Sequence, residues 1–143
     1  MNFSKSICIL MIEDTTRKKN TFEEYLRLRL EVGLNVSLNL IHRIDDSLLE
    51  QDLMTITFNL ILVDDDLGNN LWGNTIIDRI IEETANNPEL RSIPIFYYSA
   101  GTDIITLKNK SLSPNYGHLR CCSYDSLSDS VFEFIEENTV QIK

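Results

Sequence analysis

Apolar residues recur along the chain in short runs of two kinds. Residues 7–12, 60–63 and 93–98 are apolar almost throughout, which is typical of strands at the centre of a parallel sheet, buried on both faces. Residues 36–40 alternate apolar and polar positions, which favours a strand at a sheet edge with one face partly wet. Residues 118–122 predict a fifth, weaker strand.

Between these strands, apolar residues recur at the three- and four-residue spacing of amphipathic helices. Gly33 stands where the first helix is expected to end. Ser130 and Glu133 have the spacing of caps at the start of the last helix. The predicted helices cover residues 21–32, 46–57, 74–85, 103–109 and 130–138, and residues 111–117 are expected to form a loop.

Strands and helices therefore alternate strictly, which argues for a five-stranded parallel sheet with helices on both faces. Right-handed crossovers leave few topologies open. The second and fifth strands are the least apolar and suit the edges, so the pattern predicts the flavodoxin-like order 2-1-3-4-5. The chain of 143 residues contains no repeat and no Gly/Ser linker, so we expect one α/β domain over residues 1–143.

Charge and composition narrow the classes of partner. The formal net charge of −9 argues against direct binding of nucleic acid and favours basic protein surfaces. No apolar run approaches the ~20 residues that a membrane span needs. The chain has three cysteines, Cys8, Cys121 and Cys122. Because their number is odd and two of them are adjacent, we expect no disulfide framework. Because the first apolar run reads as a buried strand and not as a secretion signal, we expect a cytoplasmic protein.

Acidic residues follow two of the central strands. Glu13 and Asp14 end the first, and Asp64, Asp65 and Asp66 follow the third. In this strand order the two ends are neighbours about 4.8 Å apart, at the edge where functional groups gather. A run of three aspartates is by itself usually a solvated loop. The second acidic pair beside it favours a functional pocket, in which Mg²⁺ would offset the repulsion between carboxylates.

At this point the sequence resembles the receiver domain of response regulators. The similar segments are residues 9–14, 59–64 and 93–100, and their order and spacing match the family over nearly the whole chain. Small insertions follow Asp64 and precede the last helix. The resemblance implies a receiver-like, flavodoxin-like fold and a part in two-component or phosphorelay signalling.

The resemblance also implies a role for each site residue. Glu13 and Asp14 would bind Mg²⁺, and Asp64 would bind it and accept a phosphoryl group. The backbone carbonyl of Asp66 would complete the metal shell. Ser99 would supply the hydroxyl that contacts the phosphoryl group and switches position. For Ser99 the residues alone leave a second interpretation equally open, in which its hydroxyl caps the following turn.

The chain departs from the family at the fifth strand, where a lysine is usual. If Tyr124 occupies the family's aromatic position, Cys122 occupies that of the lysine, and no lysine is near in the sequence. Arg120 is the nearest cation and would point to the same face as Cys122, which makes it a candidate for partial substitution. Cys121 and Cys122 would face opposite ways, as buried structural thiols. The segment 67–73 replaces the usual loop after the phosphoacceptor, and its Trp72 is either a partner contact or packed on its own helix.

Three functions remain open. The first is a stand-alone signalling switch that acts through a histidine kinase, a phosphotransfer protein or a downstream effector. It would be no enzyme beyond its own phosphorylation and dephosphorylation. The second is a pseudo-receiver, a binding module independent of phosphorylation. The third is a Mg²⁺-dependent phosphatase or nuclease, since Asp64-Asp65-Asp66 is similar to the D-x-D of haloacid-dehalogenase-like phosphatases. Receiver-like domains often pair through their last helices, so a homodimer also stays open.

Overall fold

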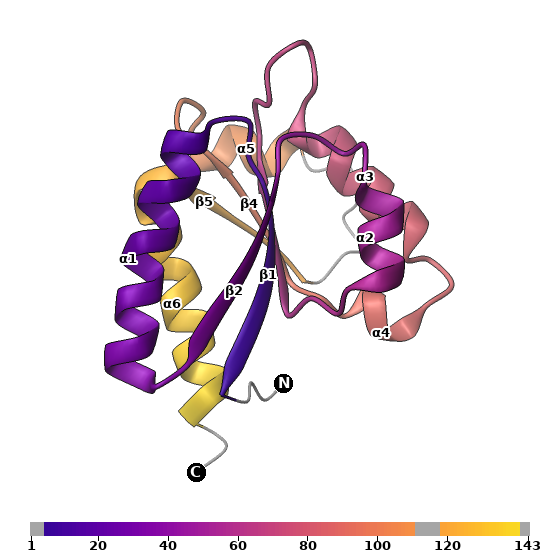
Figure 1. Cartoon of the computed structure of the whole chain (residues 1–143). Helices are drawn as coiled ribbons and strands as arrows, with labels where there is room; N and C mark the ends of the chain where they lie inside the picture. The colour runs from indigo at the N-terminus through magenta and orange to yellow at the C-terminus, as the bar shows by residue number, and fades with distance from the viewer. Residues whose placement is uncertain (1–4, 111–117, 141–143) are drawn as a thin grey trace.

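The structure is a computed structural model that describes residues 5–110 and 118–140. Five strands form one parallel sheet in the order β2-β1-β3-β4-β5 (Figure 1), which confirms the predicted fold class and strand order. The predicted loop at 111–117 lies outside the described residues. The strands are β1 (Ser6–Ile12), β2 (Ser37–Arg43), β3 (Leu60–Asp64), β4 (Ile95–Ser99) and β5 (Leu119–Ser123).

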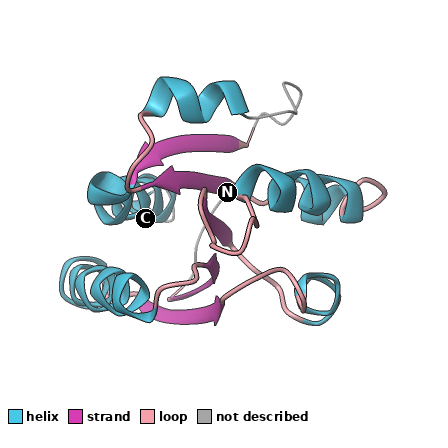
Figure 2. Cartoon of the chain, turned by 90° about the horizontal axis from the view of Figure 1, so that it is seen from above, coloured by secondary structure: helices cyan, strands magenta, loops and turns pink. Residues whose placement is uncertain are grey.

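Helices cover both faces of this sheet. Helices α1 and α6 pack together on one face, and α2 and α3 lie on the other (Figures 1 and 2). Helix α5 packs against β4 and β5. The helices are α1 (Thr16–Leu34), α2 (Leu49–Thr55), α3 (Gly73–Glu83), α4 (Pro88–Arg91), α5 (Ile104–Lys110) and α6 (Tyr124–Val140).

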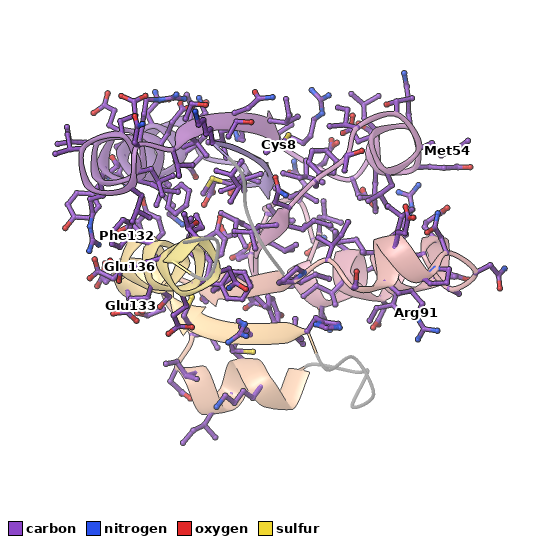
Figure 3. All side chains as sticks on the ribbon, turned by 90° about the horizontal axis from the view of Figure 1, so that it is seen from below. Cys8, Met54, Arg91, Phe132, Glu133 and Glu136 are labelled. Atoms are coloured by element: carbon purple, nitrogen blue, oxygen red, sulfur yellow. The ribbon has the colours of Figure 1, made fainter. Side chains whose placement is uncertain are left out.

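The central strands are buried on both faces, as their apolar runs predict. Along β1, Ile9 and Met11 join the core under α1 and α6, whereas Leu10 and Ile12 join the core on the opposite face. This alternation follows from the pleat of a strand. Phe132 of α6 lies toward α1, where the Arg29 guanidinium stands over its ring at 4.0 Å (Figure 3).

The predicted start and end of α1 are wrong. The helix begins at Thr16, not at residue 21, and it continues through Gly33. It ends at Asn35, which adopts the left-handed backbone conformation with φ 55° and donates its N–H to the carbonyl of Leu30. Asparagine tolerates this conformation better than most residues. The polar first turn hid the start of the helix because it adds no apolar residue to the stripe.

The predicted start of α6 is also wrong. The helix begins at Tyr124, and Ser130 and Glu133 lie inside it. Ser123 caps it, because its hydroxyl oxygen accepts a hydrogen bond from the N–H of Ser126 at 3.3 Å. The early helix brings Leu127 into the core beside Val131. Six residues that the sequence suggests are irregular are therefore helical.

Two smaller differences concern the short elements. Pro88 lies beyond α3 as expected, but it also starts α4, whose first N–H groups are accepted by the side chain of Asn87. Strand β2 runs to Arg43, beyond its predicted end at residue 40, so its last residues reach the carboxyl end of β1. Within the described residues, no helix is both long and apolar enough for a membrane span.

Candidate functional site

The predicted acidic residues converge at the carboxyl ends of β1 and β3, at the top of Figure 1 and facing the viewer of Figure 2. Glu13, Asp14 and Asp64 each offer a carboxylate oxygen, and these atoms all lie within 4.8 Å of one another. Glu13 and Asp64 are buried, whereas Asp14 is exposed. The site is therefore two buried acids with a third at the solvent edge.

Asp64 is the least satisfied member of this group. Its Oδ2 atom is buried and has no hydrogen-bond partner. Burial, and then the neighbouring charge of Glu13, raise the pKa of Asp64 to about 7. Burial also raises the pKa of Glu13. Because a charge within a few ångströms favours the protonated form of its like-charged neighbour, the pair holds a proton more tightly than isolated carboxylates would.

Glu13 is held in place by partners on two strands, β2 and β4, and in its own loop. Its Oε2 accepts a hydrogen bond from the N–H of Thr15 at 3.0 Å, and its Oε1 accepts one from the hydroxyl of Tyr98 on β4 at 3.0 Å. Its backbone N–H donates to Arg43 of β2, and its carbonyl accepts from the Nε2 of His42 at 2.6 Å. Glu13 is thus held by hydrogen bonds, whereas Oδ2 of Asp64 accepts none.

A lysine enters the site from an unexpected element. The Nζ atom of Lys18, on the first turn of α1, lies 3.6 Å from Oδ2 of Asp64. Its side chain is 22% exposed, so it is largely covered. Lys18 was missed in the sequence because the helix was expected to start at residue 21. With the start at Thr16, Lys18 lies beside the carboxyl end of the sheet.

Asp65 belongs to a separate arrangement on the other side of β3. It is as buried as Asp64, but its Oδ1 accepts a short hydrogen bond from the hydroxyl of Tyr97, and its Oδ2 accepts one from Thr102 at 3.4 Å. Burial and the hydrogen bond to Asp65 raise the pKa of Tyr97, so it stays a donor. Asp65 is thus neither the solvated loop residue that a run of aspartates suggests nor an open ligand.

Ser99 lies where the resemblance places it, and its oxygen also caps the turn. It is buried and lines the pocket, and its oxygen accepts from the N–H groups of Gly101 at 3.2 Å and Thr102 at 2.9 Å. Both interpretations made from the sequence are therefore compatible with its position. No acceptor within residues 5–110 and 118–140 takes a hydrogen bond from the Ser99 hydroxyl.

The loop after β3 forms one wall of the site. Asp66 pairs with Trp72 in an antiparallel bridge, and its side chain accepts from the N–H of Gly68. Trp72 is 42% exposed at the pocket, as one of the two interpretations expects of a contact residue. Gly73 starts α3 so close to β3 that a Cβ atom there would lie 2.2 Å from the carbonyl oxygen of Asp64. Only glycine fits this approach.

Together these residues line an open pocket of about 590 Å³. The pocket is wide enough for a phosphoryl group with bound water. Its lining is largely acidic and polar, and it comprises Asp14, Thr15, Lys18, Asp64, Asp65, Asp66, Gly68, Trp72, Ser99, Ala100, Gly101 and Thr102.

Comparison with known proteins agrees with this fold. No protein-family model matches the sequence, and no curated protein is significantly similar to it. Solved structures are similar over most of the chain. The phosphorylated cyanobacterial phytochrome response regulator RcpA has a TM-score of 0.63 at 17% identity, with 92% of each chain covered. The chain has the receiver fold.

Two further structures extend the likeness to other organisms. The receiver domain of a signal transduction histidine kinase from Syntrophus aciditrophicus has a TM-score of 0.60 at 17% identity, covering 92% of this chain and 91% of that chain. The N-terminal domain of a response regulator receiver protein from Methanoculleus marisnigri has a TM-score of 0.58 at 19% identity, covering 92% and 94%. At such identities the likeness establishes the fold alone.

Arg120 does not reach the pocket of this receiver fold. Its guanidinium lies over the ring of Phe134 on α6, at 4.8 Å from the centroid. It does share a face with Cys122, as expected, but that face is covered by α6. Cys122 is buried under α1 and α6, and Cys121 is partly buried on the opposite side, so the two thiols face opposite ways as predicted, although Cys121 is less buried than expected. The cation at Asp64 is Lys18.

Proposed function

We propose that this chain is a receiver-like signalling module in which Asp64 accepts a phosphoryl group in a Mg²⁺-dependent reaction. The observation that carries the proposal is the open acidic cluster. Three carboxylates converge within 4.8 Å, and the buried Oδ2 of Asp64 has no hydrogen-bond donor. A buried acceptor left in this state costs free energy unless a ligand satisfies it. The receiver fold supports the same interpretation.

The donor set fits a hard divalent cation, because all of its members are oxygens. Asp14, Asp64 and the backbone carbonyl of Asp66 would hold the ion, with Glu13 beside them. When bound, Mg²⁺ would offset the charge of the acids and of an incoming phosphoryl group. The positive charge of the ion would also oppose the burial and the Glu13 charge that raise the pKa of Asp64.

The protein's own residues then have simple tasks. Asp64 attacks phosphorus through a carboxylate oxygen. The phosphorus–oxygen bond forms as the phosphorus–nitrogen bond of a phosphohistidine donor breaks, and the imidazole leaves. Ser99 keeps accepting from the backbone of its turn while its hydroxyl hydrogen contacts a phosphoryl oxygen. Tyr98 holds Glu13 in place throughout.

The partner in this proposal is a protein. A histidine kinase or a phosphotransfer protein would supply the phosphoryl group, and a downstream effector would read the outcome. The acidic surface, from a net charge of −9, favours basic partner surfaces. In this proposal the chain catalyses nothing beyond its own phosphorylation and dephosphorylation.

The test uses Mg²⁺ and beryllofluoride, a phosphoryl mimic, with amide NMR shifts as the readout. We expect Mg²⁺-dependent shifts at Asp64 and Ser99 in the wild type and none in Asp64→Asn. Asp66→Asn is the matched control. It removes one charge two residues away, but it keeps the backbone carbonyl and an oxygen for Gly68. A wild type that responds to neither reagent contradicts the proposal.

A second candidate, the pseudo-receiver, is favoured by a different observation. Tyr25, Leu28 and Val32 form an exposed apolar stripe on α1, with 52%, 64% and 78% of their surfaces accessible. Exposed apolar stripes often mark protein contacts. If beryllofluoride has no effect, binding of a partner without phosphorylation becomes the working function.

A further inference from the structure

We infer that Lys18 does the work of the missing fifth-strand lysine, contacting the phosphoryl group on Asp64 from helix α1. This inference rests on the proposed function. It assigns a phosphoryl-contacting residue to an element that the family pattern does not use for it. The residue at the family's lysine position, Cys122, is buried in the apolar core and offers no charge.

The first support is geometric. Lys18 Nζ lies 3.6 Å from the one oxygen of Asp64 that lacks a hydrogen-bond partner. This separation is longer than a direct hydrogen bond, so the ammonium is not hydrogen-bonded to Asp64 itself and is near enough to contact an oxygen of a phosphoryl group carried by Asp64. In the part of the chain that the structure describes, no other ion pair reaches Glu13, Asp14 or Asp64.

The second support is that Tyr124 holds Lys18 at both ends. The Tyr124 hydroxyl donates to the backbone carbonyl of Lys18 at 2.8 Å. The Lys18 ammonium lies 5.5 Å from the centroid of the Tyr124 ring, within the range of a cation–π contact. Tyr124 directly follows β5, so the end of this strand still positions a lysine, although the lysine comes from α1. Tyr124 is therefore a positioning residue for Lys18.

Other cations near this end of the sheet have different partners. Lys19 pairs with Glu23 at 2.7 Å on α1, and Arg43 pairs with Asp52 through two hydrogen bonds. Arg120 lies over Phe134. Lys18 is left as the cation directed at the reacting carboxylate.

The experiment compares Lys18→Met with Lys19→Met in the full chain. Both variants remove one positive charge from adjacent positions of α1, and methionine keeps the apolar stem. Affinities for Mg²⁺ alone and for beryllofluoride with Mg²⁺ are measured by titration with amide NMR shifts. Lys18→Arg tests whether restoring the charge rescues binding.

Opposite effects on the two ligands are expected. A lost charge-assisted contact weakens beryllofluoride binding by roughly tenfold or more in Lys18→Met. Mg²⁺ binds about twofold to fivefold more tightly there, because a repelling cation is gone. In Lys19→Met both affinities stay within about twofold of the wild type, because Lys19 pairs with Glu23 on α1 and not with an acid of the site. Lys18→Arg recovers part of the beryllofluoride affinity.

Three other outcomes contradict the inference. Unchanged beryllofluoride binding in Lys18→Met would show that Lys18 makes no contact with the phosphoryl mimic. Parallel weakening of both ligands would show a structural role only. A wild type that binds Mg²⁺ but not beryllofluoride would overturn the proposed function, and the inference would fall with it.

Discussion

Asp64 and Asp65 are adjacent and equally buried, but their carboxylates differ in the hydrogen bonds that they accept. Asp65 accepts hydrogen bonds from the hydroxyl groups of Tyr97 and Thr102, whereas Oδ2 of Asp64 accepts none within the described residues and has the Lys18 ammonium 3.6 Å away. The pleat of β3 sends one side chain toward α1 and the other toward the far face. Neighbouring tyrosines of β4 serve the two faces separately, because Tyr98 donates to Glu13 and Tyr97 to Asp65. Burial alone therefore does not mark a functional carboxylate, whereas burial without a donor does.

The largest expected effect comes from removing Asp65, the acid whose oxygens accept hydrogen bonds from two hydroxyl groups. Asp65→Ala removes the acceptor of two hydroxyl groups and leaves the Tyr97 hydroxyl buried without that partner, so we expect a loss of about 3 kcal/mol in the free energy of unfolding. Chemical denaturation measures this loss. Asp64→Ala is the comparison, and it should cost less than half as much, since no hydrogen bond ends at its buried Oδ2. Equal losses would contradict the distinction between the two acids.

A smaller effect appears in the pH dependence of stability. The pKa of Asp64 is raised to about 7 in the folded chain, so between its unfolded value near 4 and pH 7 the folded state binds more protons. The free energy of unfolding should then fall as pH rises through this window, by on the order of 2 kcal/mol from this residue. Asp64→Asn removes the titration and should flatten that fall.

Denaturation of wild type and Asp64→Asn at pH 4, 5.5 and 7.5 tests this expectation in metal-free buffer. The difference between the two proteins isolates Asp64 from the other acids. A difference that stays constant across the pH range would show that Asp64 has an ordinary pKa. Added Mg²⁺ should reduce the difference at pH 7.5, because bound cation favours the ionised form.

The smallest effect sharpens the roles of the two tyrosines. Tyr98→Phe removes one donor from Glu13, which keeps the N–H of Thr15, so we expect a loss of about 1 kcal/mol. Tyr97→Phe should cost more, about 2 kcal/mol, because it removes a buried hydroxyl donor to Asp65 and keeps the longer contact from Thr102. Thermal unfolding ranks the two variants. A larger loss of stability in Tyr98→Phe than in Tyr97→Phe would show that Glu13 depends more on its tyrosine donor than Asp65 does.

The fold was open to prediction from sequence because its signals are local. Three apolar runs and one alternating run give the strands, and their relative polarity gives the edges. The starts of α1 and α6 could not be predicted from the sequence, because their first turns are polar and add nothing to a hydrophobic stripe. Their caps depend on backbone conformation, as at Asn35, or on a single serine such as Ser123.

The acids of the site were predictable because they end two neighbouring strands. Lys18 was not, since its place depends on where α1 begins and on Tyr124, which is 106 residues away in sequence. Arg120 was a reasonable candidate by strand position, yet the face it shares with Cys122 is covered by α6. The partners of Asp65 were invisible for the same reason, because Tyr97 looked like one more apolar residue in a buried strand.

The close approach of Gly73 to β3 has an evolutionary consequence. A Cβ atom there would lie 2.2 Å from the Asp64 carbonyl, so every other amino acid would push α3 away from the acceptor strand. Descendants that keep the site should therefore keep an aspartate followed nine positions later by glycine, whatever else drifts. This spacing is therefore a constraint that a structure-based alignment of distant relatives can check.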